Sequence, residues 1–91
     1  MPLYTYIACY KGRSHADQDR RSNYRGFAAI VLGRMPEGAL PGLTSKSLRQ
    51  EMVHKAFRSE WTLVSNRKNA WRTKFELGGS EFELYAIQTK D

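Results

Sequence analysis

The chain has little of what stabilises secreted or membrane proteins. Its 91 residues include a single cysteine, Cys9, so no internal disulfide can form, which is typical of a reducing compartment. The longest apolar run, 27–32, has six residues and is too short to cross a membrane. The first residues lack the long apolar core of a signal peptide. We therefore expect a cytoplasmic protein with no membrane partner.

Residues that carry catalytic chemistry are equally sparse. There are two histidines, and the glycines are too scattered to form a phosphate-cradling loop, so no cofactor is predicted. His15, Asp17 and Asp19 alternate and would share one face of a strand, which allows a metal or acid–base site. Cys9 could be paired with a histidine, but no oxyanion-forming loop accompanies it. A small metal-dependent hydrolase is therefore the third hypothesis, behind two kinds of binding protein.

Composition indicates one small basic domain spanning residues 1–91. Hydrophobic residues make up 41% of the chain and charged residues 26%, which suffices for a modest core. The net charge is +6 and is uneven. Residues 1–74 carry 14 Lys and Arg against five acids, whereas residues 75–91 carry one Lys against four acids. This basic body favours nucleic acid or an acidic protein surface as the partner, although the same charge could simply solubilise the domain.

The segment 70–87 predicts a β-hairpin closed by Gly78-Gly79, because a two-residue hairpin turn needs positive φ angles. In that register Phe75 faces Phe82, and Glu76 faces Glu81. Alternation along each strand then sorts the side chains into two faces. The predicted core face holds Trp71, Thr73, Phe75, Leu77, Phe82, Leu84 and Ala86. The other face holds Arg72, Lys74, Glu76, Glu81, Glu83 and Tyr85.

The first strand is predicted over residues 3–10, and both of its faces are partly apolar. We assign the more aliphatic set to the core, namely Leu3, Thr5, Ile7 and Cys9. The tyrosine-bearing set then lies on the open side, namely Tyr4, Tyr6, Ala8 and Tyr10. A turn at Lys11-Gly12 leads into a polar edge strand over residues 13–19.

Two helices are expected between the strands. Residues 22–35 favour a helix, although Asn23–Gly33 also fits a buried strand. Residues 36–43 form a loop whose Leu40 and Leu43 reach the core. Residues 44–59 form the clearest helix, with three candidate caps and an apolar stripe of Leu48, Met52, Val53, Ala56 and Phe57. A strand follows at 61–65. The order β-β-α-α-β-β-β predicts an α+β fold: one mainly antiparallel sheet of four to five strands with two helices on one face.

The open face carries the main functional hypothesis, a non-catalytic nucleic-acid-binding module. Aromatic rings beside cations can stack bases and hold phosphates. The predicted residues are Tyr4, Tyr6, Tyr10 and Tyr85 with Arg72 and Lys74. A second cluster could contact phosphates, or could be the solvated side of a helix: Lys46, Arg49, Lys55, Arg58, Arg67 and Lys68. The alternative is a protein-interaction module of the accessory or inhibitory kind that uses the same face, since Tyr and Arg also anchor interfaces.

Overall fold

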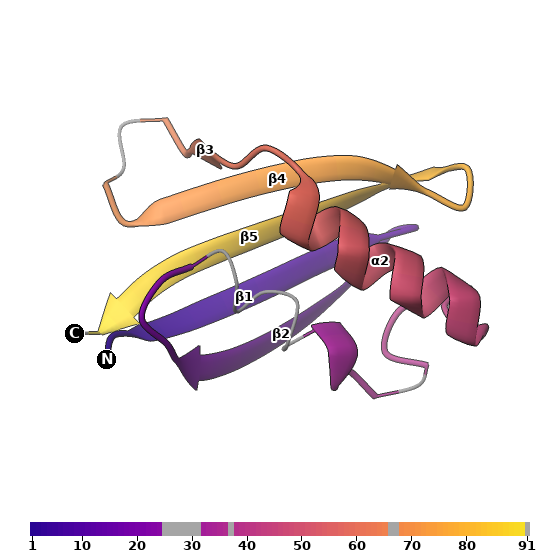
Figure 1. Ribbon diagram of the computed structural model, residues 1–91, viewed down its shortest axis with the longest axis horizontal. Coiled ribbons are helices and arrows are strands. Elements are labelled where there is room, and N and C mark those ends of the chain that lie inside the picture. Colours follow the sequence, from indigo (N-terminus) through magenta and orange to yellow (C-terminus); the bar gives the residue numbers. More distant parts are fainter. Residues whose placement is uncertain (25–31, 37, 66–67, 91) are drawn as a thin grey trace.

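A five-stranded antiparallel sheet dominates the computed structural model, which describes residues 1–24, 32–36, 38–65 and 68–90. The strand order is β2-β1-β5-β4-β3, and a helix crosses one face of the sheet (Figure 1). The elements are β1 (Leu3–Tyr10), β2 (Arg13–Arg20), α2 (Lys46–Arg58), β3 (Thr62–Leu63), β4 (Ala70–Leu77) and β5 (Ser80–Lys90). The predicted α+β sheet is therefore confirmed in its coarse form.

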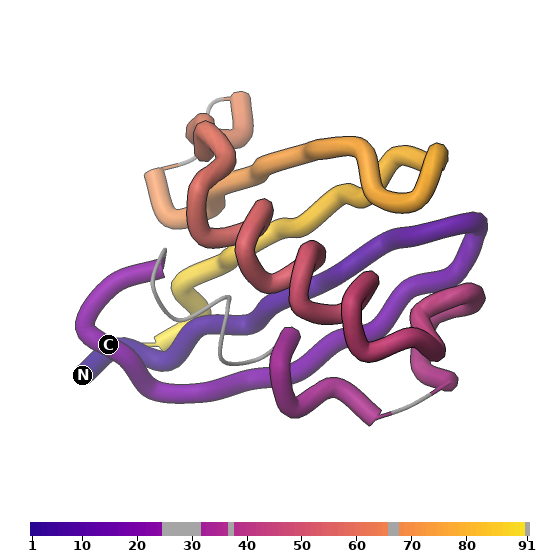
Figure 2. Tube along the Cα trace, turned by 45° about the vertical axis from the view of Figure 1, so that its right-hand side comes forward, coloured from indigo at the N-terminus to yellow at the C-terminus, as the bar shows by residue number. Residues whose placement is uncertain are grey.

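Of the two predicted helices, the described residues contain the second one in full. The first one, expected over 22–35, falls largely on residues 25–31, outside the described part of the chain, and so does the choice between helix and strand for most of Asn23–Gly33. Leu32 and Gly33, at the end of that segment, are helical. The full-length helix among the described residues is α2 (Figure 2).

Two tight turns fix the register of the sheet. Gly78 and Gly79 have φ angles of 57° and 84°, and Lys11 and Gly12 have φ angles of 49° and 78°. Positive φ at both central residues is the geometry that matches the twist of a two-residue hairpin. Phe75 consequently lies opposite Phe82, as predicted. The edge strand β2 also forms where the sequence predicted it.

The prediction for the faces of β1 is wrong. Tyr4, Tyr6 and Tyr10 are between 1% and 4% exposed and point to the side covered by α2. Strand pairing requires this, because Tyr10 lies opposite the buried Phe82 and Ala8 lies opposite the buried Leu84. Residues that face each other across a ladder share one face of the sheet. Leu3, Thr5, Ile7 and Cys9 therefore lie on the open face.

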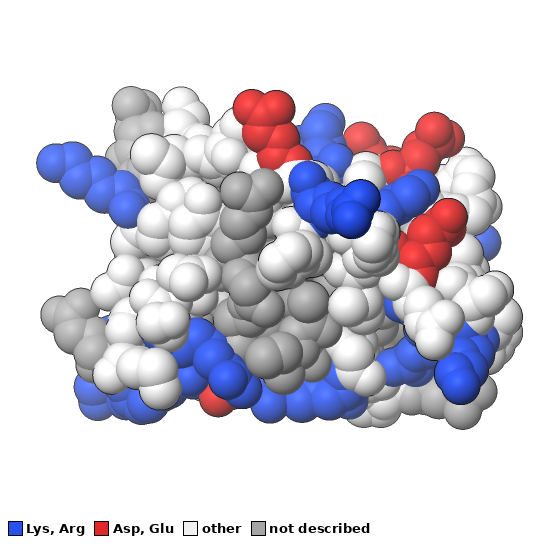
Figure 3. All heavy atoms as spheres, viewed as in Figure 1, with Lys and Arg blue, Asp and Glu red and all other residues white. Residues whose placement is uncertain are grey.

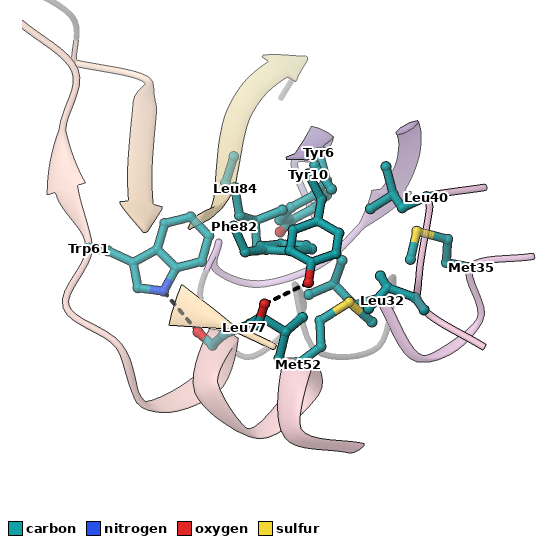
Figure 4. Close-up of a cluster of buried hydrophobic side chains, with 14 of the residues drawn as sticks. Tyr6, Tyr10, Leu32, Met35, Leu40, Met52, Trp61, Leu77, Phe82 and Leu84 are labelled. Atoms are coloured by element: carbon teal, nitrogen blue, oxygen red, sulfur yellow. Dashed lines mark hydrogen bonds between the residues drawn. The ribbon is translucent and has the colours of Figure 1, made fainter. Parts of the chain in front are cut away.

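The physical reason is that each buried phenol has both a space to fill and an acceptor for its hydroxyl. Tyr10 Oη donates to the Leu77 carbonyl at 2.5 Å, and Tyr6 Oη donates to the Tyr24 carbonyl at 3.0 Å. The Tyr10 and Phe82 rings pack with centroids 5.6 Å apart. Figure 4 shows Tyr10 between the sheet and Met52 of α2, with its hydrogen bond to Leu77. Buried tyrosines are normally satisfied in this way.

Helix α2 begins after Ser45, whose hydroxyl accepts a hydrogen bond from the Leu48 amide at 3.1 Å. This is one of the three predicted caps. Met52 and Ala56 are completely buried, whereas Phe57 is 54% exposed, so its place in the predicted apolar stripe is wrong. Positions 52 and 56 are one turn apart and point at the sheet. Position 57 is rotated about 100° around the helix axis from position 56.

The remaining core comes from segments outside the regular elements. Leu40 and Leu43 are buried as predicted, together with Leu32 and Met35. The predicted strand 61–65 is reduced to Thr62–Leu63, because Trp61 turns inward instead. Its indole N–H donates to the Ala56 carbonyl at 3.2 Å and so satisfies a carbonyl near the end of α2.

We expect Tyr10→Phe to lower the free energy of unfolding by about 1–3 kcal/mol, because the Leu77 carbonyl would remain buried without its donor. The matched control is Tyr85→Phe on the open face, where water reaches the ring and the expected change is below about 0.5 kcal/mol. Urea denaturation of both variants measures the difference. Equal costs would place Tyr10 outside the core.

Candidate functional site

The open face of the sheet is the most extensive functional candidate. It is formed by alternate residues of the strands, on the side opposite α2. Along the adjacent strands β1 and β5 it presents partly exposed apolar side chains, with Thr5 between Leu3 and the others: Leu3, Ile7, Cys9, Tyr85 and Ile87. Ile7 lies at the centre of this group, opposite Tyr85 in the register of β1 and β5. We call these five residues the apolar patch.

Charged side chains border the apolar patch and are paired. Arg72 binds Glu83 with 2.7 Å between nitrogen and oxygen, and Lys74 lies 3.6 Å from Glu81. The Arg72 guanidinium also lies over the Tyr85 ring, 5.9 Å from its centroid. With Glu76 on the same face of β4, the glutamates of this border outnumber its cations. On the β4 and β5 side the border therefore offers no surplus of positive charge to a phosphate backbone, whereas on the β2 side Arg20 lies opposite Leu3.

A hollow of about 400 Å³ adjoins the patch at one end of β4 and β5. Val64 and Asn69 line it beside Ala70, Tyr85 and Ile87. Its walls are mainly aliphatic and aromatic carbon, with the Asn69 side-chain amide bonded to the Gln88 carbonyl at 3.0 Å. An apolar hollow of this kind can take one anchoring side chain of a partner.

Cys9 lies in the patch opposite Glu83 on the neighbouring strand. Burial raises the pKa of its thiol, and the negative charge of Glu83 raises it further. Burial also raises the pKa of the Tyr85 hydroxyl, again with a contribution from Glu83. Both groups therefore remain neutral at physiological pH, and Cys9 is not an activated nucleophile.

The structure divides the predicted base-stacking residues. Tyr85, Arg72 and Lys74 lie on the open face as predicted. Tyr4, Tyr6 and Tyr10 lie in the core, and burial raises the pKa of the Tyr6 hydroxyl far above its usual value. A buried ring cannot stack on a base, so the face keeps one of its four predicted tyrosines.

The cations of the second predicted cluster are separated along α2 and beyond it. Lys55 donates to the Glu76 carbonyl at 2.7 Å and lies 3.9 Å from Glu51. The Arg49 guanidinium donates to the Met35 carbonyl. Arg58 and Lys68 are exposed, and Arg67 lies outside the described residues. Figure 3, viewed from the helix side, shows Lys and Arg both over α2 and along the edge where β2 lies.

The predicted acidic site on β2 is occupied by an arginine. Asp17 and Asp19 share the helix-covered face of the sheet, opposite Tyr6 and Tyr4. Arg34 binds both carboxylates, at 3.1 and 3.0 Å. The Arg20 backbone amide and Arg34 together lower the pKa of Asp19. Among the described residues, no group of three or more His, Cys, Asp and Glu side chains is arranged to hold a metal ion.

Sequence reasoning assigned the β1 members of the apolar patch to the core, because they are the more aliphatic half of that strand, and placed Tyr85 on the open face. The neighbouring edge strand gave no signal for this choice, because it carries polar residues on both faces: Asp17 lies opposite Tyr6. The hollow depends on Val64 and Asn69, which lie outside regular strands, and their positions had no signal in the alternation of the strands.

No family model, curated protein or solved structure matches this chain, so the site is interpreted from its own geometry. In the part of the chain that the structure describes, no helix is long and apolar enough to span a membrane.

We expect Glu83→Gln to increase the rate at which Cys9 reacts with a thiol reagent at pH 8 by about two- to fivefold. Removing the negative charge lowers the pKa of the thiol and raises the fraction of reactive thiolate. Glu76→Gln, on the same face and farther from Cys9, is the control and should leave the rate unchanged. An unchanged rate in Glu83→Gln would show that Glu83 does not act on Cys9.

Proposed function

We propose that the chain is a non-catalytic protein-interaction module whose open sheet face docks a partner protein. The observation that carries the proposal is the apolar patch, which crosses β1 and β5 on the side away from α2 and is partly exposed, with no described helix or strand packed over it. Connected apolar side chains on a surface are a mark of protein-binding sites, because covering them removes hydrocarbon from water.

The charges around the patch indicate the chemistry of that partner. Arg72–Glu83 and Lys74–Glu81 form two adjacent rows of opposite sign, one on β4 and one on β5. A surface with an apolar centre and both signs of charge at its rim complements such a border, and a uniformly acidic surface does not. This argues against the predicted acidic protein partner for this face.

The hollow beside Tyr85 gives the proposed interface an anchor point. Tyr85 and Ile87 line the hollow and belong to the patch, so one partner side chain could fill the hollow while its neighbours cover the patch. Interfaces commonly concentrate their binding energy in a few such buried contacts.

Binding of nucleic acid remains a prediction, and we infer that it would use residues other than those of the open face. The open-face borders of β4 and β5 carry no excess of cations, so the surplus that gives the chain its net charge of +6 lies elsewhere. Arg58 and Lys68 are exposed away from that border and could contact phosphates without reading sequence.

Ile7→Asp tests the proposal, because it places a charge at the centre of the patch without opening the core. Sedimentation equilibrium detects self-association, and capture from nuclease-treated extract identifies other protein partners for titration as purified proteins. We expect Ile7→Asp to weaken the measured affinity at least about tenfold. Phe57→Asp, an exposed apolar position on the helix side, is the matched control and should bind normally.

Labelling of Cys9 gives the second measurement. A bound partner should slow its reaction, since Cys9 belongs to the patch. Binding that survives Ile7→Asp, or that leaves Cys9 equally reactive, would contradict the proposal, as would a chain that stays monomeric and captures no protein. Oligonucleotide binding that Ile7→Asp leaves intact would assign nucleic-acid recognition to another surface.

A further inference from the structure

A second concave site lies on the other side of the sheet. One face of α2 and residues of the preceding segments enclose a cleft of about 510 Å³. Its helical wall consists of Lys46, Arg49, Gln50, Val53 and His54. Gly33 and Thr44 contribute from outside the helix. Each of these helical residues lies three or four positions from another one, so together they form a continuous stripe along α2.

The described lining of this cleft is basic and polar. Lys46, Arg49 and His54 can carry positive charge, and none of the described lining residues is acidic. Two cationic side chains outside the cleft lining, in contrast, lie beside carboxylates: Lys55 lies near Glu51, and Arg34 binds Asp17. The cleft therefore concentrates positive charge that no described acid of its lining neutralises.

The start of α2 has the wrong charge for an isolated helix. Its first turn contains Lys46 and no acidic residue, although the amino end of a helix is positive and favours anions. An exposed cation there is mildly unfavourable. An anion bound at this end of the helix would interact favourably with both Lys46 and the helix dipole. Departures from a local rule of this kind tend to occur at functional sites.

Arg49 lines the cleft and is held in place by a hydrogen bond. Its guanidinium donates to the Met35 carbonyl, which fixes the side chain against the segment that precedes α2. A guanidinium has five N–H donors, and Met35 is its one hydrogen-bond partner among the described residues. Guanidinium donors held in this way suit the oxygens of a phosphate group.

We propose that this cleft binds the phosphate group of an organic phosphate ester. Lys46, Arg49 and His54 hold the phosphate oxygens, and the Val53 side chain contacts the organic part. Gln50 and Thr44 supply a side-chain amide and a hydroxyl for a polar group on that part. The volume lies in the range of about 300–1,000 Å³ that is usual for sites of small organic ligands, and exceeds what inorganic phosphate alone would fill.

The site is independent of the apolar patch, because α2 covers the opposite face of the sheet (Figure 1). The ester could be that of a free nucleotide or that of a nucleic-acid strand, and both present the same phosphate oxygens. The proposal concerns that shared chemistry, and the experiment separates the two sources.

The experiment titrates the ¹⁵N-labelled chain with adenosine monophosphate, adenosine, inorganic phosphate and a single-stranded oligothymidylate of about eight nucleotides, a length within the usual range for single-strand binders. Shifts of the backbone amides locate the ligand, and calorimetry measures affinity. We expect the monophosphate or the oligonucleotide to bind more tightly than phosphate or adenosine, with the largest shifts at Thr44, Lys46 and Arg49.

Variants identify the cleft as the site. Lys46→Gln and His54→Gln should each weaken phosphate-ester binding about tenfold, as expected for a charged hydrogen bond. Lys46→Gln should leave the unfolding midpoint unchanged or higher, since it removes the unfavourable cation from the first turn. Lys90→Gln, at an exposed cation at the end of β5 and outside the cleft lining, is the control and should change affinity less than twofold.

Tighter binding of the monophosphate would assign the site to free nucleotides, and tighter, salt-sensitive binding of the oligonucleotide would assign it to a nucleic-acid strand. The proposal is overturned if no phosphate ester shifts the amides of the cleft, or if Lys90→Gln weakens binding as much as Lys46→Gln. Loss of binding in Ile7→Asp would place the ligand on the open face and would also overturn it.

Discussion

The packing of the β1 tyrosines against α2 is the constraint on which the rest of the structure depends. The hydroxyl of Tyr10 donates to the Leu77 carbonyl and so ties β1 to the end of β4, across the intervening strand β5. Tyr6 makes the equivalent bond to the Tyr24 carbonyl. With both donors satisfied, large rings can fill the depth between the sheet and α2, which smaller aliphatic side chains of a chain this short would leave open.

Fixing that face determines the chemistry of both sides of the sheet. Because side chains alternate, placing Tyr6 and Ala8 inside forces Ile7 and Cys9 outside, where they meet Tyr85 and Ile87. The open face becomes apolar at its centre, with paired charges of both signs along β4 and β5. Basic side chains accumulate over α2 and along β2, as Figure 3 shows. The two proposed sites therefore differ in chemistry. A partner protein would cover hydrocarbon at the apolar patch, and a phosphate ester would neutralise positive charge in the cleft on α2.

Much of the fold could be predicted because local chemistry specified it. Gly78-Gly79 permitted one turn geometry, and that turn fixed which residues of β4 and β5 face each other. Ser45 and the spacing of Met52 and Ala56 located α2 in the same way. These features depend on neighbours within a few residues, so a single sequence contains the information that determines them.

The face of β1 could not be predicted because both of its halves are compatible with burial. Ile7 and Cys9 are more hydrophobic, whereas Tyr6 and Tyr10 are larger, and volume decided the outcome through contacts with Tyr24 and Leu77 that are distant in sequence. Because Tyr4, Tyr6 and Tyr10 are buried, they are not available for the predicted stacking on bases. The cleft on α2 was predicted only in part: Lys46 and Arg49 belong to the predicted phosphate-contacting cluster, whereas Gly33 and Thr44 lie outside α2 and had no signal in its periodicity.

The orientation of β1 is tested most directly by photochemically induced nuclear polarisation, in which a dye in solution polarises only those tyrosine rings that it can touch. The account predicts a signal from Tyr85 and none from Tyr4, Tyr6 and Tyr10 in the folded chain, with all of them appearing on unfolding. Polarised signals from Tyr4, Tyr6 and Tyr10 in the folded chain would contradict it, because the tyrosine row would then be the open face.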